Sequence, residues 1–215
     1  MDTTKLREHT APRSAEETRL LLTAAAIAGP LFYLSSAVQA LVRPGFDLRV
    51  HPLSQLATGD LGWIQVLTFV LAGLGVLGLA VAHLRVVTDG VGSRVVPVFL
   101  GIFGAAFAVA GGFPMDPQNG FPIGAPEGSV DMSWHAVAHS AAAVLSFVAL
   151  AAACITLLIR ALRARHMRAA VGHGITALVL LLPVSPSKAS LQIAVTGLIA
   201  FTWVTAYSLI LRRGR

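Results

Sequence analysis

The chain has 215 residues, of which 55% are hydrophobic and 12% are charged, and its formal net charge at pH 7 is +6. With a mean hydropathy of +0.75, it carries more apolar surface than one soluble core of this length could bury, which excludes an ordinary globular domain. The basic residues flank apolar stretches singly or in short clusters. This distribution is typical of a membrane protein and argues against a nucleic-acid partner.

Six apolar stretches follow one another, most near the roughly 20 residues that a helix needs to cross the hydrocarbon. They cover residues 20–42, 63–84, 95–113, 134–159, 169–184 and 190–211. We predict an all-α polytopic bundle of six transmembrane helices (20–211), between a polar cytoplasmic tail (1–19) and a basic cytoplasmic C-terminus (212–215). The fifth stretch is the shortest, which indicates a short, tilted or partly re-entrant segment.

Basic residues predict how the bundle is oriented. Thirteen of the 16 lysines and arginines fall in the two termini or in the second and fourth loops. The three exceptions are Arg43, Arg49 and Lys188. Because basic residues concentrate on the cytoplasmic side, both termini are predicted to be cytoplasmic, in a multi-pass protein of the cell membrane. Trp63 and Trp134 would then begin their spans at the outer interface.

Small and polar residues within the spans predict how the helices pack. Gly73, Gly101 and Gly104 are expected at helix contacts, where small residues allow close approach. Four polar residues are expected to form hydrogen bonds between helices: Tyr33, Gln39, Gln192 and Tyr207. Two histidines are expected at the cytoplasmic interface, where their rings can reach water: His83 and His173. Two helix N-caps are expected: Asp60 before the second span, and either Asp131 or Ser133 before the fourth.

The predicted outer side carries the unusual chemistry. His135 and His139 open the fourth span, and their i, i+4 spacing puts both imidazoles on one helix face about 6 Å apart along the axis, so that they could share a metal ion. His51 in the first loop would add a third imidazole. Asp116 in the third loop could serve as a fourth ligand, as a group that orients a ligand, or as a general base. A hydrogen-bonded network without metal, or a site for a polar ligand, fits the same residues.

These residues also carry a family resemblance. Residues 51–57 read His-Pro-Leu-Ser-Gln-Leu-Ala, residues 62–65 Gly-Trp-Ile-Gln, and residues 112–117 Gly-Phe-Pro-Met-Asp-Pro, followed by the histidine of the next span. In this order they resemble the bacterial and archaeal membrane family called domain of unknown function 998, over residues 20–211. The resemblance implies a six-helix membrane protein without an established activity.

A more distant chemical likeness is to the alkaline ceramidase-like intramembrane hydrolases, whose site uses a serine, an aspartate and three histidines. Five residues supply the same types here: Ser54, Asp116, His51, His135 and His139. The serine follows the first histidine instead of preceding it by a helical turn, the HxxxH pair lies in the fourth span instead of the last, and one span is missing. The likeness is an analogy of chemistry and not homology.

Two functional classes therefore stay open. In the first, a metal centre, most plausibly zinc held by the three histidines, activates water for attack on an ester or amide bond of a lipid-like substrate, with Asp116 and Ser54 as catalytic residues. In the second, a non-enzymatic bundle in the lipid bilayer binds or passes a small amphipathic molecule, or supports a partner.

Overall fold

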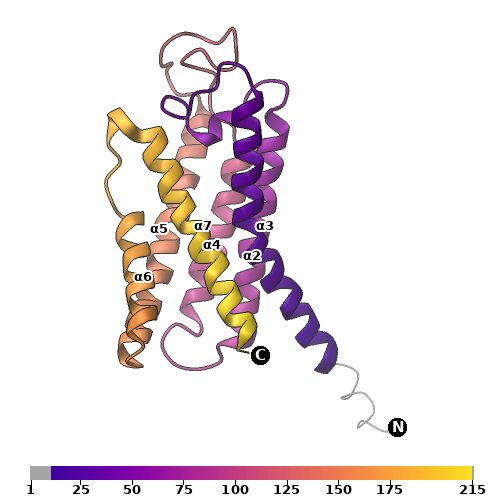
Figure 1. Cartoon of the computed structure of the whole chain (residues 1–215), viewed down its shortest axis with the longest axis vertical. Helices are drawn as coiled ribbons and strands as arrows, with labels where there is room; N and C mark the ends of the chain where they lie inside the picture. The colour runs from indigo at the N-terminus through magenta and orange to yellow at the C-terminus, as the bar shows by residue number, and fades with distance from the viewer. Residues whose placement is uncertain (1–10, 215) are drawn as a thin grey trace.

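The structure, a computed structural model, describes residues 11–214, and within them every regular element is a helix. The elements are α2 (Ala11–Val42), the short η1 (Leu53–Ala57), α3 (Gly62–Val86), α4 (Val95–Gly112), α5 (Trp134–Arg163), α6 (Met167–Leu180), the short η2 (Pro186–Lys188) and α7 (Ala189–Arg213). The long helices lie roughly side by side in one elongated bundle (Figure 1). The prediction of an all-α membrane bundle is confirmed at this level.

Five helices are long and apolar enough to cross a membrane: α2, α3, α4, α5 and α7. The fifth predicted span corresponds to α6, which has 14 residues and is therefore shorter than the roughly 20 needed. It ends ahead of Pro183, which has no N–H to continue a helix, and the chain runs on without helical structure to η2. The start of α2 and the end of α7 lie at the same end of the bundle (Figure 1), as an even number of crossings requires. The count of six spans stays a prediction.

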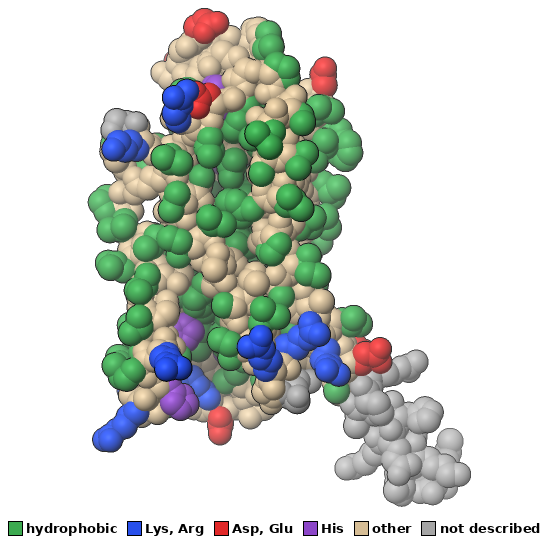
Figure 2. Space-filling model, viewed as in Figure 1, with side chains coloured by type: hydrophobic (Ala, Val, Ile, Leu, Met, Phe, Trp, Pro, Cys, Tyr) green, Lys and Arg blue, Asp and Glu red, His purple; other side chains and the backbone are tan. Residues whose placement is uncertain are grey.

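The two ends of the bundle differ in composition. At one end the segments 43–61 and 113–133 fold over the helices; we call these two segments the cap, and this end the cap end. Lysine and arginine side chains gather at the opposite end, which we call the basic end (Figure 2). If basic residues mark the cytoplasmic side here as they do generally, the cap faces outward.

Cysteine labelling of intact cells tests this orientation. In a Cys154→Ala background, which removes the buried thiol, a cysteine at Ile123 of the cap, which is 74% exposed, should react with a membrane-impermeant maleimide. A cysteine at Ala164, exposed at the basic end, should react only after the cells are opened. Reaction of Ala164→Cys but not Ile123→Cys in intact cells would reverse the orientation.

The helix starts differ in part from prediction. Residues 11–19 of the predicted polar tail belong to α2, and residues 1–10 of that tail lie outside the described part of the chain. Ser133 caps α5 as predicted, because its hydroxyl accepts a hydrogen bond from the Ala136 N–H at 3.3 Å. Asp60 does not cap α3; Leu61 occupies the N-cap position without a side-chain hydrogen bond, so that prediction is wrong.

Glycines bring α3 and α4 together. A Cβ atom built on Gly73 would lie 2.5 Å from the Gly104 carbonyl oxygen, and one on Gly104 would lie 2.7 Å from that of Gly73. The two backbones therefore touch, as predicted for these two residues. Gly101 has nothing within 4 Å of its added Cβ, so the predicted contact at that glycine is wrong.

Polar side chains tie other helices together. The Tyr33 hydroxyl of α2 donates to the Ala194 carbonyl of α7 at 2.8 Å, and the Gln39 amide donates to the Gln65 side-chain oxygen of α3 at 2.7 Å. These interhelical bonds were predicted for both residues. Gln192 of α7 instead donates to the Pro183 carbonyl in the segment after α6. It therefore binds the linker between α6 and α7, and the interhelical bond predicted for it is wrong.

One side of the bundle is incompletely covered. Helix α5 packs on α4 and α6, and α7 packs on α2, while α5 and α7 have little direct contact. Helix α6 fills the space beside them at the basic end, but it stops about halfway and only the segment to η2 continues toward the cap end (Figure 1). In the cap half of the bundle, α5 and α7 instead line a cavity, with Ala143 and Phe147 from α5 and Ile193, Ala194 and Gly197 from α7.

Candidate functional site

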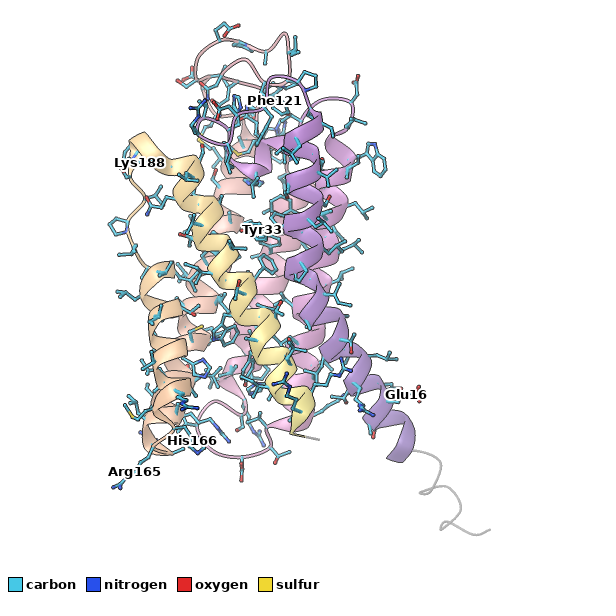
Figure 3. The ribbon with its side chains drawn as sticks, viewed as in Figure 1. Glu16, Tyr33, Phe121, Arg165, His166 and Lys188 are labelled. Atoms are coloured by element: carbon cyan, nitrogen blue, oxygen red, sulfur yellow. The ribbon has the colours of Figure 1, made fainter. Side chains whose placement is uncertain are left out.

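The cap is held together by the side chains of the His-Pro-Leu-Ser-Gln-Leu-Ala segment. Gln55 is fully buried, and its amide donates to the backbone carbonyls of Gln118 at 2.8 Å and Phe121 at 3.1 Å. Phe121 is 1% exposed and lies within the cap above α2 (Figure 3). Because one glutamine satisfies two carbonyls of the other segment, the two parts of the cap fold as a unit.

Arg43, at the end of α2, is the buried cation of this cap. Its guanidinium donates to the carbonyls of Leu56 at 2.5 Å and Thr58 at 2.6 Å, and its central carbon lies 4.8 Å from the centre of the Phe121 ring. Burial lowers the pKa of Arg43, and the nearby Asp60 carboxylate partly offsets this shift. The charge is thus held by carbonyl dipoles and an aromatic face.

His51 has a structural place in the cap. Its Nδ1 accepts a hydrogen bond from the Asp47 N–H at 2.9 Å, so the proton of the neutral ring sits on Nε2, which donates to the Asn119 carbonyl at 2.9 Å. Both ring nitrogens are therefore engaged: the lone pair of Nδ1 accepts a hydrogen bond, and Nε2 carries the proton, so neither nitrogen is free to bind a metal.

Asp116 and His135 meet at the N-cap of α5. The Asp116 carboxylate accepts a hydrogen bond from the Ser133 N–H at 2.7 Å, and the Ser133 hydroxyl lies 2.8 Å from His135 Nδ1. The hydrogen bonds from Ser133 lower the pKa of Asp116, with His135 adding a smaller effect in the same direction. Because the pKa of Asp116 is lower in the folded protein than in the unfolded chain, its ionised form stabilises the fold at any pH above the ordinary carboxyl pKa. This contribution is lost as the pH falls through the lowered pKa.

His139, one turn further along α5, faces a different place. Its Nδ1 lies 2.7 Å from the Ala110 carbonyl oxygen and 3.1 Å from that of Phe113. The Ala110 carbonyl also accepts from the Phe113 N–H at 3.4 Å, so His139 binds at the C-terminal end of α4, where the last carbonyls lack the usual helical partners. The ring is 5% exposed, and its other nitrogen, Nε2, has no hydrogen-bond partner among residues 11–214.

The four residues predicted to converge thus occupy three separate places: His51 in the cap, Asp116 and His135 at the α5 N-cap, and His139 beneath the cap. Within the described residues no group of three or more histidine, cysteine or acidic side chains is arranged to hold a metal ion. The structure does not bring the four residues together, because each one forms hydrogen bonds with other groups: backbone groups for His51, Asp116 and His139, and the Ser133 hydroxyl for His135.

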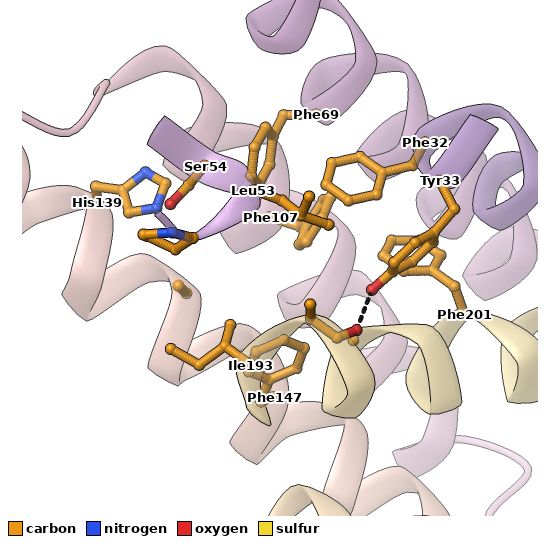
Figure 4. Close-up of a pocket in the computed structure, with 14 residues that line it drawn as sticks. Phe32, Tyr33, Leu53, Ser54, Phe69, Phe107, His139, Phe147, Ile193 and Phe201 are labelled. Carbon is orange, nitrogen blue, oxygen red and sulfur yellow. Dashed lines mark hydrogen bonds between the residues drawn. The ribbon is translucent and has the colours of Figure 1, made fainter. Parts of the chain in front are cut away.

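A cavity lies beneath the cap, between α2, α3, α4, α5 and α7, with a volume of about 70 Å³. Its lining is mostly aromatic and aliphatic: Phe32, Tyr33, Pro52, Leu53, Phe69, Phe107, Ala143, Phe147, Ile193, Ala194, Gly197 and Phe201. Two polar side chains join them, Ser54 from η1 and His139 from α5, and they point toward one another at one end (Figure 4). Ile193 of α7, one of the lining residues, is 39% exposed, so the cavity wall reaches the surface of the bundle.

A second buried polar cluster, which the sequence did not predict, lies at the basic end. His83 is fully buried; its Nδ1 lies 2.8 Å from the Tyr207 hydroxyl and its Nε2 3.2 Å from the Gly92 carbonyl oxygen. His173 Nδ1 accepts from the indole N–H of Trp203 at 2.9 Å. His83 lies at the basic end, but its ring is buried and does not reach water as predicted, while the interhelical bond predicted for Tyr207 is confirmed.

Sequence reasoning also missed Gln55, Arg43 and the aromatic lining of the cavity. Gln55 stands inside the motif that carried the family resemblance, so the signal was present, but a glutamine in a loop does not reveal which carbonyls it will meet. The five phenylalanines come from five helices, and hydropathy shows that they are apolar without showing that they leave a space between them.

Comparison with known proteins agrees with the architecture. The family described as protein of unknown function (DUF998) matches residues 26–210, which is most of the chain. No curated protein and no solved structure matches, and nothing supports the likeness to alkaline ceramidases. The chain therefore belongs to the DUF998 family of membrane proteins.

Proposed function

We propose that the protein binds an amphipathic molecule, taken from the surrounding bilayer, in the cavity beneath the cap. The observation that carries this proposal is the make-up of the cavity: an apolar, largely aromatic wall that reaches the surface of the bundle, with Ser54 and His139 at its polar end. Ligand sites combine these two features, a mostly hydrophobic lining and a few placed polar groups.

The size of the cavity suggests how such a molecule would lie. One water needs roughly 10–15 Å³ on this measure, so about 70 Å³ holds several waters or a short piece of hydrocarbon. A whole lipid does not fit. The polar head with the first part of its chain would occupy the cavity, and the rest of the chain would leave between α5 and α7.

This geometry favours binding over metal-dependent hydrolysis. A zinc hydrolase would need several free ligand atoms around one point, whereas both nitrogens of His51 are engaged and Asp116 is bound to Ser133. The non-enzymatic alternative asks only for a cavity and a polar anchor, and both are available.

Photolabelling tests the proposal. The full chain in phosphatidylcholine vesicles would be irradiated with a long-chain alcohol that carries a diazirine, and labelled peptides would be located by mass spectrometry. We expect saturable labelling of the peptides that contain Ala143 and Ile193, and loss of labelling with excess dodecanol.

Two variants of neighbouring residues supply the control. Ala143→Phe fills the cavity from α5 and should remove the saturable labelling. Val144→Phe adds the same ring to a position that is 63% exposed on the lipid-facing surface, and it should leave the labelling unchanged. Labelling that never saturates and is equal in all three proteins would contradict the proposal.

A further inference from the structure

The polar end of the cavity has a defined hydrogen-bonding character, set by His139. Its Nδ1 faces two carbonyl oxygens, of Ala110 and Phe113. A carbonyl oxygen can only accept, so Nδ1 must carry the proton. In the neutral ring Nε2 is then left with a lone pair and no hydrogen. The residue therefore presents an acceptor and not a donor to the cavity.

Within residues 11–214, no group donates a hydrogen bond to that acceptor. Nε2 of His139 and the hydroxyl of Ser54 have no hydrogen-bond partner among the described residues, although the His139 side chain is almost completely buried. The other hydroxyl of the cavity, that of Tyr33, already donates to the Ala194 carbonyl, so it does not compete for the ligand.

Charge limits the ligand further. The residues that line the cavity, all within the described part of the chain, include no lysine, arginine, aspartate or glutamate. A carboxylate or phosphate would bring lone pairs against the lone pair of His139 and a charge with no counterion. An ammonium group would also be buried without a carboxylate, and burying an unpaired charge is costly.

We infer that the cavity selects amphiphiles with a neutral hydroxyl head group, which donates its hydrogen to His139 Nε2 and accepts one from the Ser54 hydroxyl. A hydroxyl is both donor and acceptor, and so it satisfies both free groups at once. This inference rests on the proposed function, because it concerns the head group of the molecule that the cavity binds. Single-chain alcohols are the simplest members of this class.

Matched chains with different heads test the inference on the wild-type protein. Four amphiphiles with the same chain would compete with the photoreactive alcohol: dodecanol, dodecyl methyl ether, dodecylammonium, and dodecanoate at a pH where it is ionised. Dodecanol and its methyl ether differ in the one hydrogen that Nε2 would accept, and we expect dodecanol to compete about tenfold more strongly, which corresponds to about 1.4 kcal/mol. The two charged amphiphiles should compete more weakly than the ether.

Variants show which atoms are responsible. Ser54→Ala keeps the His139 acceptor but removes a donor that the alcohol oxygen and the ether oxygen can both use, so it should weaken both competitors and leave the preference for the alcohol in place. His139→Phe should remove the preference altogether; because it also removes the hydrogen bond to the Ala110 and Phe113 carbonyls, its folding would be checked by thermal unfolding.

The outcomes separate this inference from the proposed function. Equal competition by alcohol and ether, or stronger competition by a charged amphiphile, would overturn the hydroxyl assignment and leave binding in the cavity intact. Competition by none of the four, together with labelling that does not saturate, would overturn the proposed function itself.

Discussion

Replacing Arg43 by methionine is expected to lower the free energy of unfolding by about 3 kcal/mol, because hydrogen bonds from a charged donor contribute roughly 1.5–3 kcal/mol each. Arg43 donates two, to Leu56 and Thr58, and methionine keeps most of the apolar stem but none of the donors. Both carbonyls belong to the segment that covers the cavity. Thermal or denaturant unfolding of the purified protein in detergent would measure the change, and cysteine reactivity in the cap would show whether it loosens.

Arg49→Met is the matched control, since it makes the same replacement in the same segment. The Arg49 side chain is 85% exposed and pairs with Asp47 at the surface, and such pairs contribute little to stability. The control should therefore unfold as the wild type does. Equal stability of both variants would mean that the buried guanidinium does not hold the cap.

The bundle could be predicted from the sequence, and the site could not. Apolar length located the five long helices, and the α5 start was correct at Trp134 because Ser133 is a recognisable N-cap. The extent of α6 was less predictable. Its hydropathy continues past Leu180, but the prolines that follow end the helix, and only the packing decides how the remaining chain reaches the cap end.

The candidate site depended on long-range contacts that no spacing reveals. His51 reaches Asn119, a residue 68 positions away, and His139 reaches back to the end of α4. The i, i+4 spacing correctly placed His135 and His139 on neighbouring turns of one helix. It could not show that the first would bind Ser133 and the second two carbonyls, and these partners decide which nitrogen remains free.

The other large effect is expected where α3 and α4 touch. Gly104→Ala should lower the free energy of unfolding by about 2 kcal/mol, because overfilling a packed contact costs roughly 1–3 kcal/mol. The new methyl group would lie 2.7 Å from the Gly73 carbonyl oxygen and 2.9 Å from the Leu77 nitrogen. These are backbone atoms, so no side chain can rotate away and the two helices must separate.

Gly101→Ala provides the control on the same helix. Its added Cβ meets nothing within 4 Å, and alanine favours a helix by up to about 1 kcal/mol over glycine, so this variant should be as stable as the wild type or slightly more stable. The comparison isolates the contact, because both variants change helix propensity equally. Since α3 and α4 supply Phe69 and Phe107 to the cavity wall, Gly104→Ala should also weaken photolabelling, whereas Gly101→Ala should not. Two variants of equal stability would show that the α3–α4 contact has room to relax.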